Sequence, residues 1–270
     1  MIVKFLRVAA TIFVVGAAAV VGYVAVMNWM TPKPIEIVTD DGRPFATAVQ
    51  PATSAWNGTI DNSGYDISFP QCSQGWPTAP VGFAIIGLND GKPFTGNPCF
   101  GSQWKWATTH DGSAIYINLA DPGQGSATKY GKRIAGDNIK RMKHAGVPVG
   151  TPVWLDIETI NTWSTPNRAM QVINETMAVL TKAGYPVGIY AAPTHWFEIS
   201  LNAVVGVPIW LPLGKYDSTA AGVVAAKKAC TEVAFGDRVP ALVQFVTKKS
   251  GNLLDHNLLC GAPVGLLRQN

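Results

Sequence analysis

Short apolar runs that suit buried strands alternate with helical segments along the chain from residue 64 onward. The predicted strands cover Gly64–Phe69, Gly82–Leu88, Ser113–Leu119, Pro152–Glu158, Pro186–Ala191, Val207–Leu211 and Val239–Val246. The predicted helices cover Gly125–His144, Asn167–Lys182 and Trp196–Leu201, with one more around Trp104 and Trp106. Strands joined through helices form parallel βαβ units. The number of units and the 270-residue length predict an α/β fold with a closed, TIM-like (β/α) barrel rather than an open sheet.

An uncharged apolar run of 23 residues, Val8–Met30, precedes the predicted barrel and follows Lys4 and Arg7. Its length suits a transmembrane helix, and the basic residues ahead of it favour an N-terminus in the cytoplasm. A cleaved signal peptide is the alternative, although such peptides usually have a shorter apolar core and a small-residue cleavage site.

Three parts of the chain follow from this interpretation. We expect a membrane anchor or signal sequence over residues 1–30, an extracytoplasmic linker over 31–60, and the barrel over 61–270. Both alternatives export the barrel, either as the outer domain of a single-pass membrane protein or as a secreted protein.

The chain has four cysteines, Cys72, Cys99, Cys230 and Cys260, and four cysteines allow three pairings. We expect Cys72 to pair with Cys99 and Cys230 with Cys260, because each bridge would then clamp one long connection. Disulfides fit an exported protein. The sequence has no CxxC motif and its four histidines are scattered, so we expect no metal site.

The net charge of +4 arises near the N-terminus, where Lys4, Arg7 and Lys33 precede the first acidic residue, Glu36. Of the 21 basic residues, 18 then remain against 17 acidic ones, and this balance gives no indication of nucleic-acid binding. Walker-type glycine loops and GxSxG motifs are absent from the sequence. Nucleotide binding and Ser/His hydrolase chemistry are therefore disfavoured, and we expect no cofactor.

Two acidic residues end the predicted strand Pro152–Glu158. Side chains alternate along a strand, so Asp156 and Glu158 are predicted to share one face with Trp154, with the two carboxylates about 7 Å apart. Hydrolysis of a glycosidic bond uses such a pair of carboxyl groups. The structural alternative is an ion pair or a helix cap, but no Lys or Arg occurs between Lys143 and Arg168.

Other polar side chains fall near the C-terminal ends of predicted strands, where (β/α) barrels carry their active sites. Asp66 is placed to share the barrel mouth with the paired carboxylates, and aromatic side chains would stack on the apolar faces of sugar rings. Most aromatic residues are expected to be core, with Trp154 the exception because it shares the carboxylate face. The predicted substrate-binding residues on these grounds are Tyr116, Asn118, Trp154, Tyr190, Trp210 and Gln244.

Several short motifs resemble those of one enzyme family in order and spacing. They are Gly64–Ser68, Phe83–Gly87, Leu155–Glu158, Gly188–Tyr190, Pro208–Leu211, Val243–Phe245 and Asp255–Asn257. Together they resemble glycoside hydrolase family 25, the lysozyme-like muramidases of bacteria and phages, over residues 64–261. The chain departs from that family at Asn118, where the family often has His, and in its cysteines and N-terminal apolar segment.

The resemblance implies a somewhat distorted (β/α) barrel that cleaves the β-1,4 bond between N-acetylmuramic acid and N-acetylglucosamine. Glu158 would be the general acid, and Asp156 would assist by orienting the acetamido group of the substrate. Asp66 and Asp255 would complete the acidic cluster, with Asp255 among the substrate-binding residues.

The sequence therefore predicts an exported hydrolase of peptidoglycan, tethered to the membrane by its N-terminal segment. Two alternatives stay open. One is a catalytically inactive glycan-binding or scaffold protein on the same barrel, because a fold does not guarantee its family's chemistry. The other is a hydrolase of a different polysaccharide.

Overall fold

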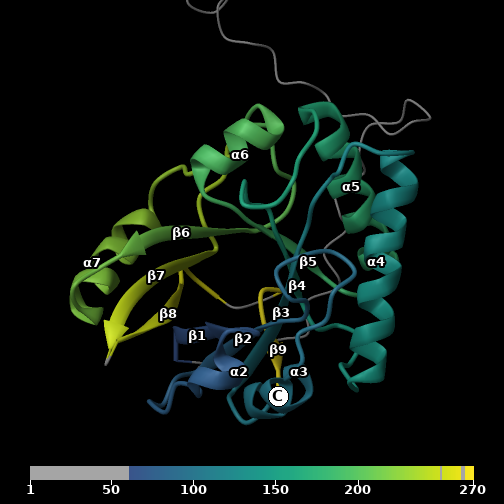
Figure 1. Cartoon of the computed structure of the whole chain (residues 1–270). Coiled ribbons are helices and arrows are strands. Elements are labelled where there is room, and N and C mark those ends of the chain that lie inside the picture. The colour runs from purple at the N-terminus through teal and green to yellow at the C-terminus, as the bar shows by residue number, and fades with distance from the viewer. Residues whose placement is uncertain (1–60, 250, 263–264) are drawn as a thin grey trace, which may run out of the picture. The chain divides into compact units, whose positions relative to one another are not determined.

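Eight strands close into a barrel in the computed structural model of the chain, which describes residues 61–249, 251–262 and 265–270 (Figure 1). The strands are β1 (Ser63–Ile67), β2 (Phe83–Gly87), β3 (Gly112–Asn118), β4 (Val153–Asp156), β5 (Val187–Tyr190), β6 (Ile209–Lys215), β7 (Leu242–Lys249) and β8 (Asn252–Leu259). Neighbouring strands from β1 to β7 pair in parallel. The predicted α/β class and TIM-like barrel are confirmed.

Helices connect the parallel strands and surround the barrel (Figure 1). They are α2 (Gln71–Gln74), α3 (Phe100–Ala107), α4 (Ala127–His144), α5 (Pro166–Lys182), α6 (Pro193–Ser200) and α7 (Thr219–Ala229). The main core lies between the outward strand residues and these helices, and α4 and α5 each turn a buried apolar face toward it. The first connection is different, because α2 is only four residues long.

The last barrel strand departs from the regular pattern. Strand β8 runs antiparallel to both β7 and β1, so a hairpin replaces the eighth helical crossover. A short strand β9 (Arg268–Gln269) pairs antiparallel with the first residues of β3, and Leu266 and Leu267 plug the barrel interior at that end. Strands β8 and β9 and helix α7 were not predicted from the sequence.

Large and small side chains alternate across the barrel interior. Phe83 and Trp154 are fully buried there, and each packs against a glycine on the neighbouring strand. A Cβ atom at Gly64 would lie 2.3 Å from the Phe83 ring, and one at Gly188 would lie 2.4 Å from the Trp154 ring. These glycines are therefore required by the close approach of the two aromatic rings.

Both predicted disulfides are confirmed. Cys72 in α2 is bonded to Cys99 just before α3, with 5.7 Å between the Cα atoms. Cys230 at the end of α7 is bonded to Cys260 just after β8, with 5.2 Å between the Cα atoms. Each bridge fixes a segment that the sheet itself does not hold.

The predicted N-terminal anchor over 1–30 and the linker over 31–60 lie outside the described residues. Among the helices of the described part, none is long and apolar enough to span a bilayer.

The barrel interior leads to a first prediction. Replacing Gly188 with Ala should destabilise the protein by about 2 kcal/mol or more, because the added methyl overlaps the buried Trp154 ring and overpacked cores must shift. Denaturant unfolding measures the change. Gly136→Ala is the matched control, since its Cβ would meet nothing within 4 Å in α4 and alanine favours a helix by about 0.5 to 1 kcal/mol. A Gly188→Ala protein as stable as wild type would contradict the packing described.

Candidate active site

Polar side chains meet inside the barrel at the C-terminal ends of the parallel strands. In the strand register, Asp66 of β1 lies opposite Asp255 of β8, and Asn118 of β3 lies opposite Asp156 of β4. Strand β8 is antiparallel, so its early residues lie at this same end. The predicted site residues that the structure brings to this end are Asp66, Tyr116, Asn118, Asp156, Tyr190, Gln244 and Asp255.

Asp66 is buried and held by two neutral amides. Its Oδ2 atom accepts hydrogen bonds from Gln244 Nε2 at 2.9 Å and from Asn257 Nδ2 at 2.7 Å. The Gln244 Oε1 atom in turn accepts a hydrogen bond from the Tyr190 hydroxyl at 2.9 Å. Burial, and next the charge of Asp255, raise the pKa of Asp66 well above its usual value despite the two amide donors.

Asp156 is equally buried, and only one of its oxygens has a partner in the described structure. Asn118 Nδ2 donates to Asp156 Oδ2, while Asp156 Oδ1 has no hydrogen-bond partner among the described residues. Burial first, then Glu158 and Asp66, raise the pKa of Asp156 well above its usual value. Asn118 is itself fixed, because Asn89 bonds its backbone N–H and C=O at 3.1 and 3.0 Å.

Glu158 lies beyond the strand that was predicted to contain it. Strand β4 ends at Asp156, and the last ladder contact is the Ile157 N–H donating to the Tyr190 carbonyl at 2.9 Å. The strand is therefore shorter than predicted, and a turn over residues 158–161 follows it. The charge of Glu158 still raises the pKa of Asp156, so the two carboxyl groups lie near each other. The turn is held by Trp163 Nε1, which donates to the Glu158 carbonyl at 2.8 Å.

The Glu158 side chain is half-buried, and burial raises its pKa, while the nearby His195 acts in the opposite direction. Burial also raises the pKa of Asp255, to about 6. Within the described residues, no Lys or Arg forms an ion pair with Asp66, Asp156, Glu158 or Asp255. The cluster therefore carries acidic groups that hold protons to a higher pH than free carboxyl groups do.

Two tyrosines stand beside the acids. Burial raises the pKa of Tyr116 and Tyr190 well above the usual value, and the neighbouring carboxyls, first Asp66 for Tyr116 and first Asp156 for Tyr190, add to the effect. Both phenols therefore stay neutral and are able to donate hydrogen bonds. Each is only partly buried.

Trp154 and Trp210 lie beneath this layer. Only 1% and 2% of their surface is exposed, and their rings meet edge to face with centroids 5.8 Å apart. The prediction that they contact substrate directly is not supported, because neither ring is accessible. They form the floor on which Tyr116 and Tyr190 pack, with ring centroids 6.2 and 4.7 Å from Trp210.

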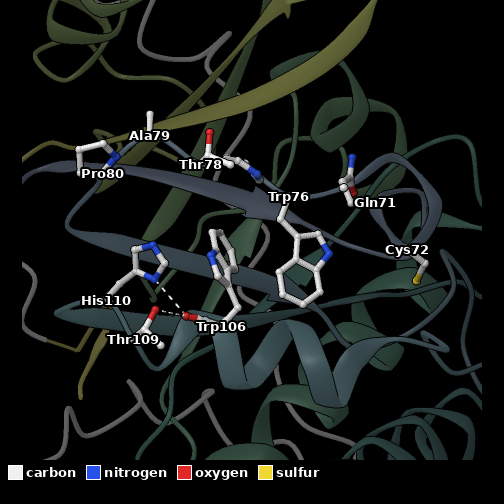
Figure 2. A pocket seen from close by; sticks show the side chains of 11 residues that line it. Gln71, Cys72, Trp76, Thr78, Ala79, Pro80, Trp106, Thr109 and His110 are labelled. Atoms are coloured by element: carbon white, nitrogen blue, oxygen red, sulfur yellow. Dashed lines mark hydrogen bonds between the residues drawn. The ribbon is translucent and has the colours of Figure 1, made fainter.

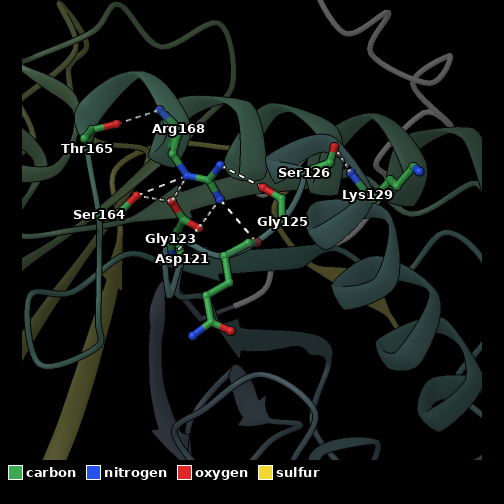
Figure 3. Close-up of polar contacts among 9 residues, drawn as sticks. Asp121, Gly123, Gly125, Ser126, Lys129, Ser164, Thr165 and Arg168 are labelled. Atoms are coloured by element: carbon green, nitrogen blue, oxygen red, sulfur yellow. Dashed lines mark hydrogen bonds and ion pairs between the residues drawn. The ribbon is translucent and has the colours of Figure 1, made fainter.

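An ion-pair clasp next to the site joins the loop after β3 to the start of α5 (Figure 3). Arg168 donates to both oxygens of Asp121, at 3.2 and 3.1 Å, and to the Gly125 carbonyl at 3.0 Å. Burial alone would raise the pKa of Asp121, but hydrogen bonds from Arg168 and Ser164 outweigh it and hold the pKa below its usual range. The Asp121 N–H also donates to Thr162 O at 2.8 Å, so the clasp fixes the loop that carries Glu158.

Sequence reasoning assigned no role to four residues that support the site: Ser68, Asn89, His195 and Asn257. Asn257 was predictable, because it lies two residues after Asp255 and so faces the same side of β8. Ser68, which bonds the Tyr116 hydroxyl, and Asn89 depend on contacts between strands far apart in the sequence. Within the described residues, no group of three or more His, Cys, Asp or Glu side chains is arranged to hold a metal ion.

No protein-family model matches the sequence, and no curated protein matches it. Solved structures do resemble the barrel. A family 25 glycosyl hydrolase from Bacillus anthracis matches with a TM-score of 0.51 at 15% identity, over 78% of this chain and 93% of that one. A muramidase from Acremonium alcalophilum matches with a TM-score of 0.50 at 15% identity, over 74% of this chain and 94% of that one. At such identities the likeness establishes a shared fold.

The clasp gives a second prediction. Arg168→Leu should destabilise the protein by about 3 kcal/mol, because it leaves the Asp121 charge buried without its partner. Thermal or denaturant unfolding measures the loss. Adding Asp121→Asn in the same chain should recover part of it, since the unpaired charge is then removed. If the double variant is no more stable than Arg168→Leu alone, the loss has another cause.

The raised pKa of Asp255 gives a third prediction. An unfolded aspartate releases its proton near pH 3.8, whereas the folded protein keeps it until about pH 6. The contribution of Asp255 to folding stability should therefore fall as the pH rises from 4 to 6, by up to about 3 kcal/mol, and then level off. Asp255→Asn should abolish this part of the loss, so the variant should be more stable than wild type at pH 7 but not at pH 4.

Denaturant unfolding at pH 4, 5.5 and 7 measures this difference. Asp217→Asn, which removes an exposed carboxyl group, controls for the change in net charge. Equal stability of Asp255→Asn and wild type at all three pH values would contradict the burial argument.

Proposed function

We propose that this protein is a lysozyme-like glycoside hydrolase that cleaves β-1,4 bonds in the glycan strands of peptidoglycan. The observation that carries the proposal is the cluster of four carboxyl groups at the C-terminal ends of the barrel strands. Their pKa values are raised, and no cation pairs with them in the described residues. Acid catalysis of glycoside cleavage requires a carboxyl group that is still protonated near neutral pH.

Glu158 is the proposed general acid. Its side chain is half-buried, whereas those of Asp66 and Asp156 are buried. Its raised pKa favours the protonated form that donates to the leaving oxygen. Asp156 is its proposed partner. The Asp156 Oδ1 atom is buried and has no partner among the described residues. A substrate acetamido N–H that reached it would complete its hydrogen bonding and be oriented by it.

Asp66 has a different place in the proposal. Both of its amide donors bind the same oxygen, and its negative charge, when ionised, stabilises the positive charge that develops on the sugar ring. Asp255, Tyr116, Asn118, Tyr190 and Gln244 are the proposed substrate-binding residues. Trp154 and Trp210 support them from below.

We further propose that the barrel works outside the cytoplasm, on the wall face of the membrane or as a secreted protein. The two disulfides support this placement, because such bonds persist in oxidising compartments. Residues 1–30 would act as the anchor or signal sequence and residues 31–60 as the linker. The proposed substrate is the polysaccharide of the cell wall, and the proposed reaction is extracellular hydrolysis without a cofactor.

The fourth prediction concerns Glu158. Full-length protein carrying Glu158→Gln should release reducing ends from purified peptidoglycan about 100- to 10,000-fold more slowly than wild type, because a general acid contributes that much. The fold should be unchanged, since glutamine has nearly the same shape. Glu232→Gln is the matched control, as it neutralises an exposed carboxylate near the end of α7 and should keep full activity.

Mass spectrometry of the products distinguishes the alternatives. Muropeptides ending in reducing N-acetylmuramic acid support the proposal. Products only from another defined polysaccharide would assign a different substrate to the same acids. Wall binding without any product, by wild type and Glu158→Gln alike, would contradict hydrolysis and favour a non-catalytic binding protein.

A further inference from the structure

The outer wall of the barrel is poorly covered between β1 and β2. In place of a full crossover helix, the chain has the single turn α2 and then a segment with no helix or strand over residues 75–82. This leaves a hollow of about 720 Å³ between that segment and α3. A second hollow of about 190 Å³ adjoins it, because Trp76 and its neighbours line both.

Aromatic rings form the wall of the larger hollow. Figure 2 shows the rings of His110, Trp106 and Trp76 in a row beneath the segment that carries Thr78 and Pro80. The Trp76 and Trp106 ring centroids are 5.9 Å apart, and those of Trp106 and His110 are 4.6 Å apart. Both tryptophans are only half-buried, so part of each ring surface is open to a ligand.

The polar lining of the two hollows is made mainly of amides and hydroxyls. No Asp, Glu, Lys or Arg lines either hollow, and the polar side chains there include Gln71, Thr78 and Thr109. Within the described part of the chain, the indole N–H groups of Trp76 and Trp106 have no hydrogen-bond partner. The hollow thus offers flat apolar surfaces edged by uncharged donors and acceptors.

From this lining we propose that the hollow is a second carbohydrate-binding site, separate from the acidic cluster, that takes an uncharged segment of a glycan. Sugar rings present an apolar face that stacks on an indole, and their hydroxyl and acetamido groups pair with neutral polar groups. A phosphate or a charged peptide would find no countercharge here. Only the choice of a β-1,4-linked N-acetylated glycan rests on the proposed function.

The position of the second hollow relates it to the acidic cluster. Leu253 and Leu254 of β8 line it, and Leu254 directly precedes Asp255. Asp255 lies opposite Asp66 in the barrel and is not among the residues that line the hollow. The hollow therefore borders the strand that contributes Asp255, and none of the four acids lines it.

The fifth prediction tests this site with full-length protein labelled with 5-fluorotryptophan and carrying Glu158→Gln, so that the glycan is not consumed. The probe is the β-1,4-linked hexamer of N-acetylglucosamine. Fluorine NMR resolves the tryptophans, and Trp76→Phe and Trp106→Phe identify the two resonances of the hollow. Both resonances should shift as the hexamer is added.

Thr78→Arg should raise the dissociation constant for the hexamer on the order of tenfold, which is about the contribution of one stacked ring. Thr78 is exposed, and Arg fills the hollow without removing a packed side chain. Val224→Ala, which truncates an exposed apolar side chain on α7, is the control and should leave the titration unchanged.

The inference is overturned if millimolar hexamer leaves both resonances in place, or if Thr78→Arg binds as wild type does. It is also overturned if a peptide of residues 31–60 shifts the two resonances and the hexamer does not, because the occupant is then the chain's own linker. Failure of the proposed hydrolase function would be seen in a different measurement, as the absence of product from wild-type protein. The two resonances could still shift with the hexamer in that case.

Discussion

An ionised carboxylate loses several kcal/mol of hydration when it is buried, and the barrel buries Asp66 and Asp156 almost completely. In the described residues the compensation comes from neutral amides, Gln244 and Asn257 on Asp66 and Asn118 on Asp156. Neutral donors stabilise a carboxylate less than a cation does, so the proton stays bound to a higher pH. Asp121 shows the contrast, because Arg168 holds its pKa low at similar burial.

The antiparallel strand β8 makes this arrangement possible. A parallel eighth strand would bring its last residues to the barrel mouth, whereas β8 brings its first ones. Its inward positions then run from Asp255 and Asn257 at the mouth to Leu259 deeper in the barrel. One short hairpin thus supplies both an acid and the amide that bonds Asp66, without a crossover helix.

The repeated alternation of strand and helix was sufficient to predict the barrel and its parallel strands, but not the burial of Trp154, which was expected to contact substrate. It also placed Asp66, Asn118 and Asp156 at one end, because the ends of parallel strands coincide. It did not predict where β4 ends, since Glu158 continues the strand pattern and the turn is set by Trp163 and the clasp. Strand β8 was missed because Asn252–Leu259 lacks a regular alternation of apolar and polar residues. Its pairing with β1 joins residues from opposite ends of the domain sequence, which local patterns do not reveal.

Incomplete cover on the outer wall has a physical consequence of its own. A regular helix after β1 would bury Trp76 and Trp106 in the core between sheet and helix, as Trp196 of α6 is buried. The four-residue α2 cannot do so, and the Cys72–Cys99 disulfide holds the segment in place of helix packing. The two rings are consequently left half-exposed beside a segment that is covalently fixed at Cys72. A surface held in this way loses less entropy on binding than a free loop would, which favours even a weak ligand such as a single stretch of glycan.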